Sequence, residues 1–174
     1  MSRTRLIMAW SKCTVEIGKT GANGAMAASL TDVGVINNQS TTLEAEEGEE
    51  LEALATGGEQ VALEVLEGKY RLSTRVKEPT DALYTLLGLG AAASESEGAD
   101  YNVQTHVVEG EWSVKVTPKN VGAKGIKAPC CNIKFAPGYS EQEGNYADLT
   151  FDILKGEADY WYSRFTKPAP ASAG

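Results

Sequence analysis

The sequence predicts a mainly β protein: a β-sandwich or barrel with one short flanking α-helix and a long extended acidic β-hairpin. Glycine and other turn residues recur at intervals of about eight to twelve residues, with alternating apolar and polar residues between them, as in all-β sandwiches and barrels. A chain of 174 residues with 42% hydrophobic content can bury one core. These observations favour a globular domain over a disordered chain.

The single β domain is expected to span residues 10–165. Residues 1–9 contain two arginines but no apolar stretch behind them, so we interpret them as an N-terminal extension and not a secretion signal. Residues 166–174, rich in Pro and Ala, are expected to form a disordered C-terminal tail. The sequence has no apolar run long enough to span a bilayer. We therefore expect a protein made in the cytosol that has no membrane partner.

The segment LEAEEGEELEA, residues 43–53, holds six carboxylates and no cation. Ten carboxylates and no Lys or Arg occur between Lys19 and Lys69. The segment has three interpretations: a solvated loop, a disordered insert, or a face that repels a polyanion. Leucines spaced as in strands around Gly48 favour an extended hairpin. Because a two-stranded ribbon is not stable alone in water, such a hairpin would need neighbouring copies.

Strand alternation predicts which carboxylates share a surface. Glu44 and Glu46 should lie on one face, because successive side chains of a strand point to opposite faces. Gly48 permits a bend or bulge, which would reset the alternation for residues 49–52. Only part of the acidic set is then expected to line one surface.

A first tight hairpin is predicted at Glu67-Gly68, within EQVALEVLEGKYRLSTRVK. It would place Val65 opposite Tyr70 and Glu64 opposite Arg71.

Two further hairpins are predicted at similar dipeptides. One turns at Glu109-Gly110 and would bury Trp112 by pairing it with Val107. The other turns at Lys155-Gly156 and follows a strand with an inward apolar row, Leu149, Phe151 and Ile153. The Gly-rich segment 117–129 between them is expected to be a loop.

One helix is predicted at KEPTDALYTLLGLG. Thr80 suits the N-cap position, and Asp81 favours the positive end of the helix dipole. Gly88 should end the helix. Its leucines fall on one face, so we expect this short helix to pack on a sheet: Leu83, Leu86 and Leu87.

No motif in the sequence indicates catalysis. Gly18-Lys19-Thr20 resembles the end of a phosphate loop, but Cys13 stands where that motif needs glycine. His106 is the only histidine and is expected on the outer face of a hairpin. Adjacent Cys130 and Cys131 are expected to be reduced, and no metal-ligand spacing is present. We expect no enzyme, cofactor or metal site.

The aromatic triplet Tyr160, Trp161 and Tyr162 has two interpretations. It is either the edge of the core sheet or a subunit contact, since Tyr and Trp are enriched at interfaces.

The order of elements resembles the tail tube (major tail) proteins of tailed bacteriophages, which are related in fold to tube proteins of contractile injection systems. The resemblance covers roughly residues 10–165. It rests on a Gly-rich N-terminal section, the acidic hairpin TTLEAEEGEELEALATGGEQVALEV, the continuation GKYRLSTRVKEPTDALYTLLGLG into a short helix, and two later hairpins.

The resemblance implies a structural subunit of the virion tail, assembled in the host bacterial cytoplasm as hexameric rings that stack into a tube. Its partners would be further copies of itself, the tape measure protein, the tail terminator and baseplate or tip proteins. DNA would pass through an acidic lumen without specific binding, because like charges repel. The implied lumen or assembly residues are Glu44, Glu46, Glu47, Glu49, Glu50, Glu52, Glu59 and Glu64.

The alternative hypothesis is a monomeric β-sandwich binding module, such as an adhesin or carbohydrate binder. It requires an exposed aromatic platform, for which Trp112 and Trp161 are the candidates. A measurement of native mass separates a monomer from a ring.

Overall fold

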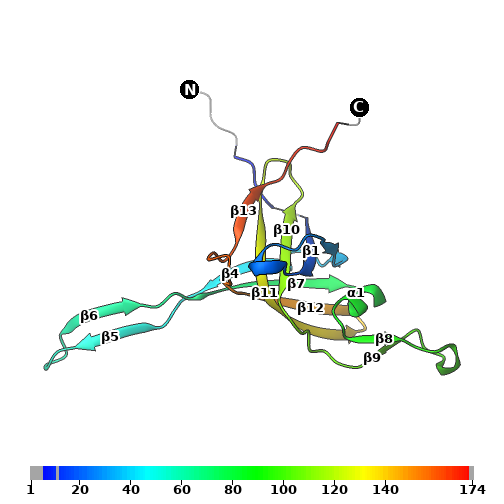
Figure 1. The fold of residues 1–174 in the computed structure, drawn as a ribbon, viewed down its shortest axis with the longest axis horizontal. Coiled ribbons are helices and arrows are strands. Elements are labelled where there is room, and N and C mark those ends of the chain that lie inside the picture. The colour runs from blue at the N-terminus through cyan, green and yellow to red at the C-terminus, as the bar shows by residue number, and fades with distance from the viewer. Residues whose placement is uncertain (1–5, 11, 173–174) are drawn as a thin grey trace.

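The computed structural model describes residues 6–10 and 12–172, and it confirms a mainly β fold (Figure 1). A nine-stranded sheet curls into a half-barrel, and its central path runs β2-β1-β10-β11-β12-β7-β3. β13 pairs with β11, and β4 pairs with β7. The strands of this sheet are β1 (Cys13–Lys19), β2 (Thr31–Asp32), β3 (Val35–Ile36), β4 (Thr42–Glu46), β7 (Lys69–Lys77), β10 (Trp112–Pro118), β11 (Lys124–Ser140), β12 (Gly144–Ile153) and β13 (Ser163–Thr166).

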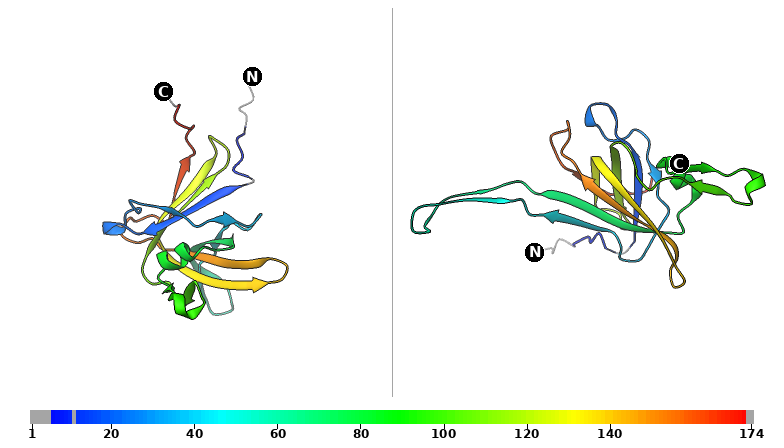
Figure 2. Two further views of the ribbon diagram at one scale, coloured as in Figure 1. Left: turned by 90° about the vertical axis from the view of Figure 1, so that its right-hand side faces the viewer. Right: turned by 90° about the horizontal axis from the view of Figure 1, so that it is seen from below.

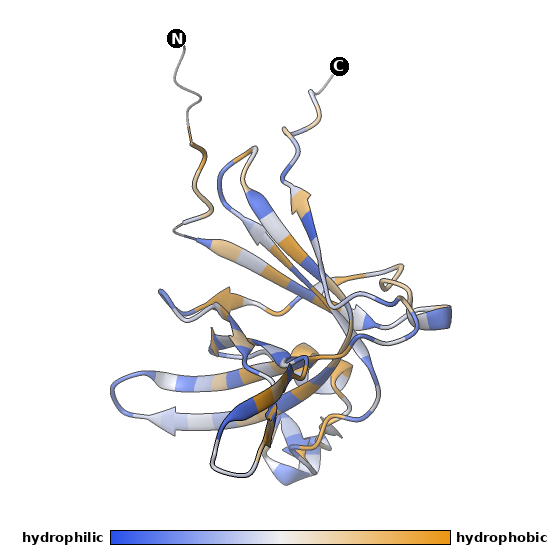
Figure 3. Cartoon of the chain, turned by 90° about the vertical axis from the view of Figure 1, so that its left-hand side faces the viewer, coloured by the Kyte–Doolittle hydropathy of each residue, from blue (hydrophilic) through white to orange (hydrophobic). Residues whose placement is uncertain are grey.

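The core lies on the inner side of the curled sheet (Figure 2). Alternation along each strand sends one row of side chains inward, and the colours of Figure 3 change from residue to residue along the strands accordingly. The predicted inward row of β12, Leu149, Phe151 and Ile153, is confirmed, because all three side chains are buried. Trp112 is also buried, as predicted.

The predicted helix is confirmed as α1 (Asp81–Leu86). The Thr80 side chain accepts a hydrogen bond from the Leu83 backbone N–H at 3.2 Å, which caps the first turn. Leu83 and Leu87 are buried against the sheet, and Gly88 follows with φ of 71°. Two short 3₁₀ turns complete the helical elements of the described residues, η1 (Ala22–Gly24) and η2 (Glu95–Glu97).

The predicted hairpin at Glu67-Gly68 is wrong. β7 pairs with β4, and the preceding strand β6 (Gln60–Val65) pairs with β5 (Glu50–Leu54). Arg71 therefore faces Glu44, not Glu64, and Tyr70 faces Ala45. The strands β5 and β6 continue the pairing of β4 with β7 in the same register. Residues 60–65 therefore face residues 50–54 and cannot also face β7.

The other two predicted hairpins have the wrong partners. Trp112 faces Lys19 of β1 and Cys131 of β11, and Val107 forms an isolated bridge with Lys134. β12 lies between β11 and β7, and β13 pairs with the start of β11. The segment 117–129, expected to be a loop, contains the end of β10, a tight turn and the start of β11.

Two ribbons project from the body on opposite sides (Figure 1). One consists of β5 and β6. The shorter one consists of β8 (Gly90–Ala92) and β9 (Tyr101–Val103). The two ends of the chain emerge together from a third side, beside β13.

The last strand of the body extends slightly past residue 165, the expected end of the domain. β13 ends at Thr166, and the Lys167 backbone N–H still donates to the Ala123 carbonyl at 2.9 Å. The expected N-terminal extension and C-terminal tail fall partly outside the described residues, at 1–5 and 173–174.

Candidate functional site

The acidic segment forms one strand of a ribbon that continues out of the body sheet (Figure 1). We call residues 47–68 the arm. Its strands β5 and β6 pair only with each other. Three residues lie between Glu46 and Glu50 on one strand, and three lie between Val65 and Lys69 on the other. The body hairpin and the arm therefore share one register.

Two glycines lie where the arm leaves the body. A Cβ atom added at Gly48 would overlap the Leu66 carbonyl, and one added at Gly68 would overlap the Glu46 carbonyl. The two strands approach so closely here that no larger residue fits. The residue counts on the two strands match, so no bulge lies at Gly48, and the only register shift between β5 and β6 lies between Ala53 and Leu54. The reset of alternation at Gly48 stays a prediction.

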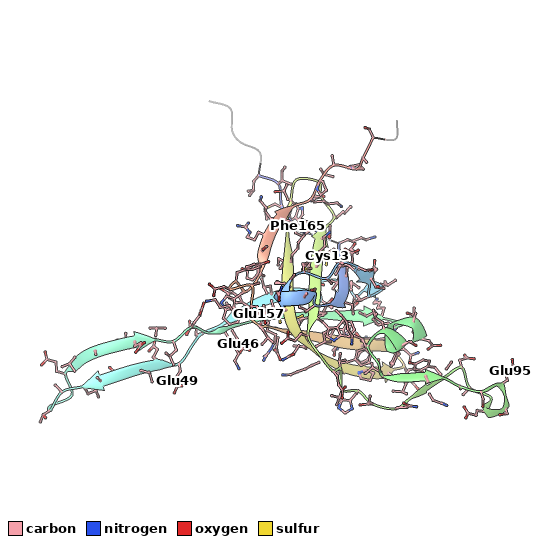
Figure 4. All side chains as sticks on the ribbon, in the orientation of Figure 1. Cys13, Glu46, Glu49, Glu95, Glu157 and Phe165 are labelled. Carbon is pink, nitrogen blue, oxygen red and sulfur yellow. The ribbon has the colours of Figure 1, made fainter. Side chains whose placement is uncertain are left out.

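Glu44 and Glu46 lie on the body, not on the arm. As predicted, both lie on one face of β4, opposite Arg71 and Lys69. The Glu46 carboxylate contacts the Arg71 guanidinium at 2.7 Å. Figure 4 shows Glu46 at the junction between body and arm.

A chain of ion pairs extends from Glu46 across three further strands. Arg71 Nε donates to Asp152 at 3.0 Å, and Lys134 Nζ lies 2.9 Å from the other oxygen of Asp152. The hydrogen bond to Asp152 and the charge of Glu46 raise the pKa of Arg71. Partial burial disfavours the charged form of Asp152, but the hydrogen bonds from Lys134 and Arg71 outweigh it and lower the pKa of this carboxyl. Glu46 and Asp152 of the body are thus paired with cations.

The acids of the arm have a different environment. The arm carries seven carboxylates and no cation. Six of them form no ion pair or side-chain hydrogen bond with any described residue, and all six are exposed: Glu47, Glu49, Glu50, Glu52, Glu59 and Glu64. Figure 4 shows Glu49 on the arm, away from the body. The structure therefore gathers these six predicted site residues into one uncompensated acidic ribbon.

The arm also exposes large apolar side chains, which the sequence analysis did not single out. Val61, Leu63 and Val65 alternate along β6 and so share one face. Their side chains are 62%, 54% and 61% exposed. Glu50 and Glu52 face Val65 and Leu63 across the ribbon. The only sequence signal for this row is its alternation, which is equally typical of a core strand.

The aromatic triplet lies in the connection before β13 and holds the root of the arm. Trp161 Nε1 donates to the Glu67 carboxylate at 2.9 Å, which together with the Lys155 charge lowers the pKa of Glu67. Tyr70 packs edge-on against the rings of Trp161 and Tyr162, at centroid distances of 5.6 Å and 5.2 Å. Tyr160 is exposed.

The remaining candidates do not form a reactive site. Gly18 and Lys19 end strand β1, so they form no phosphate loop. His106 is exposed, and within the described residues no group of three or more His, Cys, Asp or Glu side chains could hold a metal ion. The cysteines are unbonded, as predicted, and burial raises the pKa of the Cys130 thiol to about 11. Trp112 is only 1% exposed and cannot be a stacking platform.

The comparisons with known proteins find no family model and no curated protein that matches this sequence. Among the described residues, no helix has the length and apolar character needed to cross a membrane.

Proposed function

We propose that this chain is a structural subunit of a bacteriophage tail tube, in which hexameric rings stack and an acidic lumen conducts DNA. The observation that carries the proposal is the arm: every residue of β5 and β6 is exposed, including large apolar ones. A monomer gains nothing from a ribbon of this composition. The proposal also rests on the resemblance in the order of elements.

The outer edges of β5 and β6 pair with no other described strand. An isolated two-stranded ribbon is marginal in water, and its outer edges present free backbone N–H and C=O groups. If β5 of one copy lay beside β6 of the next, a closed ring of arms would pair all of these edges. Such a ring would also cover apolar side chains that water contacts in the monomer.

The charge of the arm fits the wall of a DNA channel. Six arms with seven carboxylates each would surround the channel with negative potential, which raises the energy of a nearby phosphate backbone. Adhesion of DNA needs Lys or Arg to release counterions, and the arm has neither. The duplex would slide through the tube without sticking.

Electron microscopy and native mass measurement of the purified protein test the proposal. The full chain should form rings or tubes with sixfold symmetry and an axial channel. A variant in which a Gly-Gly link replaces residues 50–65 should remain a folded monomer. In the matched control, a Gly-Gly link replaces residues 94–99 at the tip of the shorter ribbon, and assembly should persist.

Two results would refute the proposal. One is a full chain that remains monomeric at high micromolar concentration. The other is an arm-deleted variant that assembles as well as the full chain.

A further inference from the structure

The open side of the half-barrel contains a groove of about 680 Å³. Strands from both ends of the curled sheet contribute apolar side chains to it, so the groove exposes part of the interior of the body. Cys13 of β1 also lines the groove. The apolar lining that carries the argument is Val35, Ile36, Leu43, Leu72, Val116 and Ile126.

The rim of the groove is basic. Lys12, Lys77 and Lys124 line it, and none of them forms an ion pair within the described part of the chain. No carboxylate of the described residues lines the groove. Lys77 ends β7, and Lys124 begins β11. An occupant should therefore be apolar where it enters and negatively charged at its borders.

We propose that this groove binds the arm of a neighbouring copy. The proposal rests on the proposed function, because it requires that copies assemble. The arm has an apolar surface that fits the groove and the negative charge that the groove lacks. It exposes Leu54, Val61 and Leu63. Glu50 and Glu52 lie beside these side chains, and the arm has no cation. Apolar contact drives the association, and the three lysines pair with carboxylates that have no partner in the monomer.

The competing occupant is the N-terminal segment of the chain. Ala9 of this segment already lines the groove, but its neighbours remain exposed, Trp10 at 68% among them. Its sequence also carries Arg3 and Arg5, which lie outside the described residues and would bring positive charge to a basic rim. Charge complementarity therefore favours the arm.

The geometry of this contact agrees with a ring. The arm and the groove are different surfaces, so their contact is heterologous. A heterologous contact repeats from copy to copy until it closes a ring or extends as a filament.

Disulfide trapping tests the contact through a thiol that the protein already has. Cys13 lines the groove and is partly exposed, whereas Cys130 and Cys131 are buried. Cysteine is introduced singly in the arm, as Leu54→Cys, Val61→Cys or Leu63→Cys, and the assembled protein is oxidised mildly. At least one variant should form intermolecular disulfides that peptide mass spectrometry assigns to Cys13. The matched control is Ser96→Cys at the tip of the shorter ribbon, which should not react with Cys13.

A charge swap tests the basic rim. Lys77→Glu with Lys124→Glu should weaken self-association by at least about tenfold at low salt. Adding Glu50→Lys and Glu52→Lys should restore it. The control pair Lys119→Glu with Arg164→Glu changes the net charge equally outside the groove and should leave association nearly unchanged. Light scattering against protein concentration compares the parent with these three variants.

The outcomes separate this inference from the proposed function. The groove contact alone would be overturned if the protein formed sixfold rings, no arm cysteine formed a disulfide with Cys13, and the Lys77→Glu with Lys124→Glu variant associated as strongly as the parent. A protein that never assembles would overturn both proposals. Two further results would refute the contact. One is a disulfide between Cys13 and Ser96→Cys at the same yield as with the arm cysteines, because the reaction would then not be specific. The other is a disulfide between Cys13 and the arm that forms only after deletion of residues 1–10, because the N-terminal segment would then be the natural occupant.

Discussion

The body and the arm use the same residue types under opposite conditions. On the body, Glu46 and Asp152 lie in a chain of ion pairs with Arg71 and Lys134. On the arm, six carboxylates lie exposed and have no partner among residues 6–10 and 12–172. Apolar residues differ likewise: alternating rows are buried in β12 and exposed in β6. The difference teaches that alternation assigns side chains to a face, whereas the surrounding strands decide whether that face is covered.

The largest expected effect is the loss of a core side chain from the body. Trp112→Ala should lower the free energy of unfolding by about 3–5 kcal/mol, because a buried indole leaves a large cavity. The arm counterpart Leu63→Ala should change it by no more than about 0.5 kcal/mol in the monomer, because this side chain is already exposed. Urea denaturation at a protein concentration too low for assembly measures both. Equal losses for the two variants would contradict the distinction between body and arm.

A smaller effect is expected from the ion pairs of the body. Asp152→Asn should lower the free energy of unfolding by about 1 kcal/mol near neutral pH. Because the folded protein lowers the pKa of this carboxyl, its contribution is present above the usual pKa of 3.8 and is lost as the pH falls through the lower folded value. The stability difference between parent and variant should therefore close in acid. A difference that is constant with pH would contradict the role of the charge.

The hairpin partners could not be predicted from local sequence, although much of the core could. The inward row of β12, the buried Trp112 and the Thr80 cap follow from periodicity and capping, which are local properties. Partner choice is not local. The positive φ angles at Gly110 and Gly156 show that the chain turns there, but the strands that follow join distant neighbours in the curled sheet.

The candidate functional site was likewise only partly predictable from the sequence. The long acidic hairpin and the shared face of Glu44 and Glu46 were predictable, because alternation and composition indicate them. The pairing of Glu46 with Arg71, the groove and its basic rim were not, because Cys13, Val35 and Lys124 lie far apart in the sequence and meet only when the sheet curls.

A substitution at the junction should affect the arm and spare the body. Gly48→Ala forces a Cβ atom against the Leu66 carbonyl, so the two strands must separate where the arm begins. Assembly should fall sharply in sedimentation velocity, while the unfolding midpoint of the monomer stays close to that of the parent. The control Gly57→Asn at the tip meets open space, and asparagine tolerates positive φ, so it should assemble normally. Normal assembly of Gly48→Ala would show that the close approach is dispensable.

The smallest effect on folding is expected from the arm carboxylates. Replacing Glu47, Glu49, Glu59 and Glu64 by Gln should change the free energy of unfolding by less than about 0.5 kcal/mol. It should make assembly less dependent on salt, because repulsion between arms is removed. If the chain forms the wall of a tail tube, as we propose, the loss of repulsion should also slow the exit of DNA from virions at low ionic strength.

The matched control replaces four exposed carboxylates outside the arm: Glu95, Glu109, Glu141 and Glu157. It changes the net charge equally and should leave DNA exit at the rate of the parent. Equal DNA exit rates for the arm variant and the parent at low ionic strength would remove the role of the arm as a repelling wall.

The shared register of the body hairpin and the arm has a consequence for amide hydrogen exchange. A single pair of strands runs from a buried sheet into solvent, so protection of its backbone amides should fall abruptly at Gly48 and Gly68 and not at a turn. The amides of β7, and those amides of β4 that point toward β7, should exchange slowly in every state of the protein. The amides of β5 and β6 should exchange rapidly in the isolated chain and become protected only in the presence of other copies. In the same hairpin, the body strands then serve as a reference for exchange, and the arm strands report assembly.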